Sequence, residues 1–222
     1  MSYKLKHPFN CIIAGPSGCG KTIFMRRLLA EFSDQIDINV DLVNVLWAHG
    51  QAQQLHKVPV SKANITYYDG LPSENELDEM RPDIIVIDDL MTEIANNKTV
   101  TNLFSKYGHH NNVSVFFLTQ NIFHGGSQTR STSLNSHYMV CFKNPRDERQ
   151  IEHVGRQVTP RSYPKHFFIE VFESATKDNH GYLLIDCHPK SSLLLKFRTR
   201  IFRSDNTKGK VEPIVYLPPK YV

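Results

Sequence analysis

The segment GPSGCGKT, residues 15–22, has residue types and a spacing that suit the binding of a nucleotide. It fits the pattern G-x-x-x-x-G-K-[ST], in which the backbone N–H groups of a glycine-rich loop surround phosphates. Lys21 would reach the β- and γ-phosphates, and the hydroxyl of Thr22 would coordinate Mg²⁺. The sequence therefore predicts a site for ATP and Mg²⁺ in a loop that consists of Gly15, Pro16, Ser17, Gly18, Cys19, Gly20, Lys21 and Thr22.

A second candidate group is the pair of acids at the end of the apolar run IIVIDD, residues 84–89. Ligands of open α/β sheets gather at the carboxyl ends of the strands, where Asp88 and Asp89 would lie. We predict that Asp88 holds Mg²⁺ through its waters and that Asp89 polarises the attacking water. Glu93 is the alternative candidate for the role of the base.

The apolar run VSVFFLTQN, residues 113–121, predicts another strand of the same sheet, and this strand ends in Thr119 and Gln120. A polar side chain at that edge can hydrogen-bond the γ-phosphate or the attacking water. We therefore expect Gln120 to distinguish an intact nucleotide from a hydrolysed one.

The elements that must position these residues alternate between strand and helix. A buried strand at 9–14 precedes the loop, and a helix follows from Lys21, with Ile23, Phe24, Leu28 and Phe32 near one face. Ser73 and Glu76 form the capping box of a further helix. Other predicted strands cover residues 42–50, 63–70, 83–89, 112–121 and 137–142. Such alternation predicts an α/β fold with a central, mostly parallel sheet flanked by helices.

The C-terminal part is expected to contain helices at 147–155 and 163–177 and strands at 181–187 and 193–202. We divide the chain into a P-loop domain, residues 1–189, and a basic strand with a Pro-containing tail, residues 190–222, packed on the same domain. A strand would place Lys196, Arg198 and Arg200 on one face. That face would either meet DNA phosphates or protect a sheet edge against aggregation.

The chain has 222 residues and a formal net charge of +4. This mildly basic charge permits an acidic partner such as nucleic acid without requiring one. We expect the protein to be intracellular. The four cysteines have no metal-binding spacing and are expected to be reduced thiols. No apolar run reaches the length of a membrane span, and no secretory signal is evident.

The P-loop, the strand that ends in DD and the strand that ends in TQN together resemble the FtsK/HerA branch of P-loop ATPases. The similarity is strongest to the genome-packaging ATPases of poxvirus-like and Maverick/Polinton/adintovirus-like DNA viruses, and it also includes NSHYMVCFKNPRDERQIEHVGRQ. The resemblance implies the additional-strand, RecA/ASCE-like P-loop NTPase fold. It also implies an ATPase that drives double-stranded DNA into a preformed capsid.

The resemblance further implies a homo-oligomeric ring, usually a hexamer, in which an arginine of one subunit reaches the γ-phosphate of its neighbour. Candidates are Arg130, Arg146 and Arg149. A capsid or portal-vertex protein is the implied partner, and the implied location is the host nucleus, the virus assembly site or the virion. The alternatives are a nucleotide or nucleoside kinase, a non-hydrolysing nucleotide switch, and a cellular DNA pump or helicase of the same superfamily.

Overall fold

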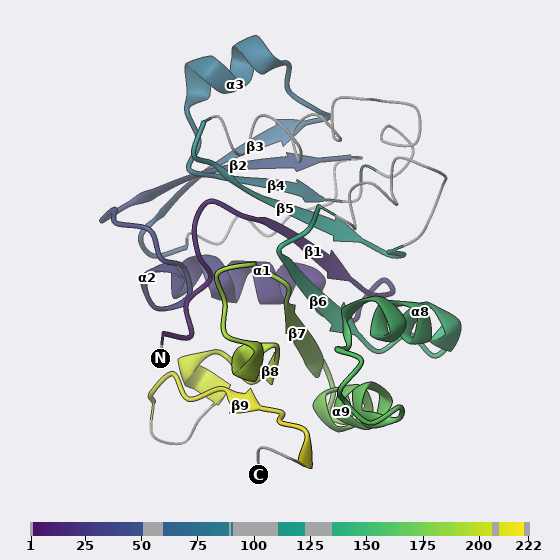
Figure 1. The fold of residues 1–222 in the computed structure, drawn as a ribbon. Helices are drawn as coiled ribbons and strands as arrows, with labels where there is room; N and C mark the ends of the chain where they lie inside the picture. The colour runs from purple at the N-terminus through teal and green to yellow at the C-terminus, as the bar shows by residue number, and fades with distance from the viewer. Residues whose placement is uncertain are drawn as a thin grey trace.

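The computed structural model describes residues 2–50, 60–88, 90, 111–122, 135–205 and 209–219. In these ranges the strands form one nine-stranded sheet in the order β3-β2-β4-β5-β1-β6-β7-β8-β9 (Figure 1). The strands are β1 Asn10–Ala14, β2 Val43–His49, β3 Ala63–Asp69, β4 Ile84–Asp88, β5 Ser114–Thr119, β6 Tyr138–Phe142, β7 Tyr182–Asp186, β8 Phe197–Thr199 and β9 Ile214–Val215. The helices are α1 Lys21–Ala30, α2 Phe32–Gln35, α3 Glu74–Met80, α8 Glu148–Val158 and α9 Phe167–Ala175.

The strands from β3 to β6 run parallel, and β7, β8 and β9 continue the sheet with antiparallel pairing. Strand β5 lies between β1, which leads into the glycine-rich loop, and β4, which ends at Asp88. This arrangement confirms the additional-strand P-loop fold, because one strand separates the strand of the loop from the strand of the acidic pair.

Helices cover both faces of the sheet, because alternate residues of each buried strand point to opposite sides. One face packs against α1 and α2, and the other packs against α3, α8 and α9. Figure 1 shows α8 and α9 next to each other near β6 and β7. The central strands are therefore mostly apolar, with polar residues chiefly at their ends, as buried parallel strands are.

Two features of α1 and α3 bear on the sequence-based predictions. The capping box of α3 is present, since the Ser73 side chain accepts from the Glu76 N–H and the Glu76 carboxylate accepts from the Ser73 N–H. In α1 the buried residues are Phe24, Met25, Leu28 and Leu29. Ile23, which was expected near the same face as Phe24 and Leu28, is instead 56% exposed in the first turn of the helix.

The strand expected over residues 193–202 is shorter than predicted. A 3₁₀ turn covers Leu193–Leu195, and the strand β8 covers only Phe197–Thr199. Lys196 lies before the strand, and Arg200 follows it with a left-handed φ of 52°. A common basic face of Lys196, Arg198 and Arg200 therefore does not form.

Arg198 is buried, which corrects both interpretations of this segment, since neither a DNA-facing arginine nor an edge guard would be inside the fold. Its side chain is 1% exposed and forms an ion pair of 3.0 Å with Asp186 of β7. It also donates to the carbonyl oxygen of Tyr3 at 2.7 Å. In addition, β9 pairs with β8, so β8 is not the edge of the sheet. Arg198 thus links the last strands to the N-terminal segment.

Candidate functional site

The predicted phosphate-binding loop connects β1 directly to α1. Gly20 is the N-cap of α1 and has a φ of 110°, a conformation that residues with a side chain rarely adopt. Gly15 is packed so closely that an added Cβ would lie 2.6 Å from Cys19 Sγ and 2.7 Å from Phe142 Cβ. Gly20 is thus required by its backbone conformation and Gly15 by close packing against neighbouring side chains. The loop presents the N-terminal end of α1, where anions bind favourably.

Lys21 lies across the loop in this structure. Its Nζ donates to the carbonyl oxygens of Gly15 at 2.7 Å and Pro16 at 3.1 Å. Both acceptors belong to the loop that would hold the phosphates. A bound triphosphate would therefore exchange carbonyl partners of the ammonium group for more strongly attracting phosphate oxygens.

Strand register brings the other predicted residues to the same edge of the sheet. Ala14, which precedes the loop, lies opposite Thr119 of β5, and Asp88 of β4 lies opposite Leu118. The Gly15 N–H donates to the Thr119 carbonyl at 3.1 Å. Gln120, exposed directly after β5, is therefore at the edge between the loop and Asp88.

Asp88 points toward the sheet face that α1 covers. Val86 and Ile84, two and four residues before Asp88 in β4, pack in the core beneath α1, and side chains of a strand repeat every second residue. Thr22 is in the first turn of this same helix. A hydroxyl and a carboxylate oxygen are ligands that suit Mg²⁺, so the residues present fit the predicted metal.

Two residues beside Asp88 were not found by sequence reasoning. The buried Trp47 of β2 donates its indole N–H to Asp88 Oδ2 at 3.3 Å, and His49 lies opposite Asp88 in the β2–β4 register. The sequence shows that residues 42–50 form a strand but does not show that this strand pairs with the strand of the acids. Trp47 reaches the carboxylate because β2 and β4 are neighbours and both side chains point to the same face of the sheet.

Three of the predicted residues, Asp89, Glu93 and Arg130, lie outside the described residues. Arg146 and Arg149 are exposed, in the turn before α8 and in its first turn. Among the described residues neither forms an ion pair. Both follow β6, which is parallel to β1, so they leave the sheet at the edge where the loop lies.

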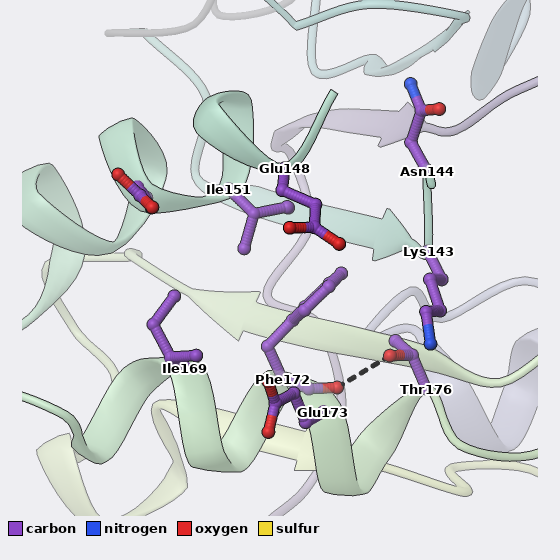
Figure 2. Close-up of a pocket in the computed structure, with 9 residues that line it drawn as sticks. Lys143, Asn144, Glu148, Ile151, Ile169, Phe172, Glu173 and Thr176 are labelled. Atoms are coloured by element: carbon purple, nitrogen blue, oxygen red, sulfur yellow. Dashed lines mark hydrogen bonds between the residues drawn. The ribbon is translucent and has the colours of Figure 1, made fainter. Parts of the chain in front are cut away.

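A pocket of about 170 Å³ lies between α8 and α9, on the sheet face opposite to α1 (Figure 2). Ile151, Ile169 and Phe172 form its apolar part, and Lys143 and Glu148 are at its polar rim. Because the glycine-rich loop leads into α1 and Asp88 points toward the sheet face that α1 covers, we do not assign this pocket to the triphosphate.

Among the helices of the described ranges, none combines the length and apolar composition that crossing a membrane requires.

Cys19 gives a direct chemical test of the loop. Burial raises the pKa of its thiol, against the opposing effect of Lys21. We expect iodoacetamide to modify Cys19 more slowly than free cysteine at pH 7.5, because only the thiolate reacts, and the rate should rise steeply toward pH 10. Mg-ATP should slow the reaction further. Peptide mass spectrometry, with the Cys19→Ser variant as a control, measures both effects; modification that is equally fast with and without ATP would contradict the placement of Cys19.

By sequence, no protein-family model matches this chain, and no match to a characterised protein was found. Several solved structures are similar in fold. The DNA-packaging ATPase B204 of Sulfolobus turreted icosahedral virus matches with a TM-score of 0.54 and 10% identity, over 96% of this chain and 98% of that chain. The genome packaging NTPase B204 of Sulfolobus turreted icosahedral virus 2, in complex with AMPPCP, matches with a TM-score of 0.52 and 10% identity, over 95% and 98%. The chain therefore has the fold of P-loop ATPases along nearly its whole length.

Proposed function

We propose that this chain is an ATP-hydrolysing enzyme that translocates double-stranded DNA during the packaging of a viral genome. The observation that carries the enzymatic part is the position of β5 between β1 and β4. It places Gln120 between the phosphate-binding loop and Asp88, where a polar side chain can orient the water that attacks the γ-phosphate. A kinase transfers the phosphoryl group to a substrate other than water, and a non-hydrolysing switch does not transfer it at all. Neither therefore requires a group that orients an attacking water.

Each residue then has a defined part in the reaction. The loop amides and Lys21 would hold the β- and γ-phosphates, while Thr22 would hold Mg²⁺ with its hydroxyl and Asp88 would hold it through water. When bound, the metal would supply positive charge that offsets the charge developing on the phosphate oxygens. Gln120 orients the attacking water, and Asp89 polarises it, with Glu93 as the alternative base.

The assignment to DNA packaging is supported by the similarity to B204 over nearly the full length of both chains. The net charge of +4 is compatible with a polyanion. We further propose a ring of identical subunits, hexameric as in the FtsK/HerA branch. In such a ring an exposed arginine, Arg146, Arg149 or Arg130, would stabilise the transition-state charge on the neighbouring subunit. A capsid or portal-vertex protein would dock this ring at the assembly site.

Phosphate release from Mg-ATP, measured with and without linear double-stranded DNA, tests this function. We expect hydrolysis that DNA stimulates, together with closed rings in negative-stain images when ATP and DNA are present. Nucleosides offered in place of DNA should not become phosphorylated. Phosphorylation of a nucleoside would favour the kinase alternative, and a monomer under all conditions would contradict the translocating ring.

Trp47 yields a further prediction for this reaction. The Trp47→Phe substitution keeps an aromatic ring in the core but removes the N–H group that orients Asp88. We expect the Mg²⁺ concentration for half-maximal hydrolysis to rise about tenfold, as for other groups that orient metal ligands. Because the chain has one tryptophan, quenching of its emission by Mn²⁺ should report on the same site in the wild type.

The matched control is Tyr68→Phe, which also removes one aromatic hydrogen-bond donor from the neighbouring strand, but a donor that serves Glu76. Its Mg²⁺ requirement should equal that of the wild type. If Trp47→Phe hydrolyses ATP with an unchanged Mg²⁺ requirement, Trp47 does not position Asp88.

A further inference from the structure

The geometry points to His180 as the residue that contacts the nucleoside part of a bound nucleotide. This inference rests on the proposed nucleotide site and deepens it, since the loop motif describes only the phosphates. The ligand chemistry is a hydrogen-bond donor on the nucleoside, either a ribose hydroxyl or the amino group of the purine.

The order of the strands sets the direction in which the nucleotide lies. On one side of β1 are β5 and β4, which carry Gln120 and Asp88, and on the other side are β6 and β7. The γ-phosphate must face Gln120 and Asp88 if these residues act on it. The nucleoside end then extends from the loop toward the side of β6 and β7, where His180 lies in the turn that precedes β7.

His180 already contacts the main chain of the loop. Its Nδ1 is 3.0 Å from the carbonyl oxygen of Cys19. A Cβ added to Gly20 would lie 3.1 Å from the same nitrogen, so the ring is packed against the residue that begins α1. The contact joins residues 161 positions apart in the sequence. A side chain at this position would border a nucleotide that leaves the loop.

The backbone holds His180 in the left-handed conformation, with a φ of 61°, which is uncommon for residues other than glycine. The turn is fixed on both sides. The Gly181 N–H donates to the Asp178 carbonyl at 2.9 Å, and the Asp178 carboxylate pairs with Arg200 at 2.9 Å. These two contacts hold the turn, so the His180 ring has a defined position against the loop.

The protonation of the ring determines what it can bind. Because the Cys19 carbonyl oxygen only accepts, Nδ1 carries the proton in this contact, and Nε2 of the neutral ring is then an acceptor. His180 is exposed, so a ligand can reach it. The exposed Nε2 of the imidazole ring can therefore accept a hydrogen bond from a ribose hydroxyl or from a purine amino group.

The test compares two ligands that share the phosphates and differ in the nucleoside. Isothermal titration calorimetry would measure Mg-ATP and Mg-tripolyphosphate on the full chain with His180→Gly, which keeps the positive φ and removes the ring. We expect Mg-ATP to bind about tenfold more weakly, the effect of one lost hydrogen bond and ring contact, and tripolyphosphate to change less than about twofold. His180→Asn, which tolerates this φ and keeps a donor for the Cys19 carbonyl, should lose ATP affinity as well.

The control is Lys62→Gly, which makes the same backbone change at another left-handed residue, with a φ of 64°, before β3. It should bind both ligands as the wild type does. Titration with ITP, whose base has no amino group, and with 2′,3′-dideoxy-ATP, whose sugar has no hydroxyl, separates the two donors, since the effect of His180→Gly disappears with the ligand that lacks the relevant group.

Equal weakening of ATP and tripolyphosphate by His180→Gly would overturn the inference, because His180 would then act on the loop alone. Unchanged ATP binding, or full recovery in His180→Asn, would also overturn it. In these cases a wild type that binds and hydrolyses ATP would leave the proposed function intact. A wild type that binds neither ligand would contradict both.

Discussion

The Lys21→Ala substitution is expected to lower ATP hydrolysis by about 100-fold or more, because it removes a cation that in the proposed function would make charge-assisted contacts with the reacting phosphates. In this structure the Lys21 ammonium group bonds to the Gly15 and Pro16 carbonyls within the loop. The half-buried side chain has no role in the apolar core, so the variant should fold. Nucleotide binding by calorimetry and phosphate release measure the effect.

The matched control is Lys165→Ala, which removes an exposed lysine ahead of α9 and should leave both quantities unchanged. Lys21→Ala should also melt within a few degrees of the wild type. Hydrolysis at the wild-type rate in a folded Lys21→Ala variant would exclude the phosphate-binding role of the loop lysine.

The Arg198→Met substitution is expected to destabilise the fold by about 3–5 kcal/mol at neutral pH, since it leaves the Asp186 carboxylate buried without its ion-pair partner. For a chain of this size such a loss corresponds to a decrease in Tm of roughly 10 °C. Methionine keeps much of the volume, so the effect reports on the charge. Thermal unfolding followed by circular dichroism measures it.

The difference in stability between Arg198→Met and the wild type should depend on pH. Burial raises the pKa of Asp186, although Arg198 beside it acts in the opposite direction. Without Arg198 the pKa of Asp186 rises further, so as the pH falls the native variant takes up a proton at Asp186 before the native wild type does, and the unpaired buried charge is neutralised. The deficit of Arg198→Met relative to the wild type should therefore shrink as the pH falls from 8 toward 5.

A second substitution separates charge from packing. Asp186→Asn retains an oxygen that can accept from the His188 N–H, as Asp186 Oδ1 does at 3.0 Å, but it carries no charge. The double variant Arg198→Met/Asp186→Asn should recover most of the stability lost in Arg198→Met at pH 7. A double variant as unstable as the single one would show that Arg198 acts through packing or through its bond to Tyr3 alone.

Most strands of the central sheet, and the helices that cover it, could be predicted from the sequence, because the residue patterns that indicate them are local. The apolar run at 84–88 and the capping box at Ser73 form the elements that their residue types indicate. The predictions that failed concern which side chains are buried. Ile23 is apolar but exposed, and Arg198 is charged but buried, since β9 and the N-terminal segment cover β8 from positions remote in sequence.

The sequence by itself determined where the glycine-rich loop lies, between a strand and a helix. Gly15, Gly20, Lys21 and Thr22 lie within this one short segment, so their spacing alone is enough to predict that the loop binds phosphates. The order of the strands around that loop is known only from the tertiary structure. That order places Gln120 between the loop and Asp88, brings Trp47 to the Asp88 carboxylate and lays His180 against Cys19. These contacts join segments far apart in the chain, and strand pairing and helix packing, which carry no local sequence signal, decide which of them meet.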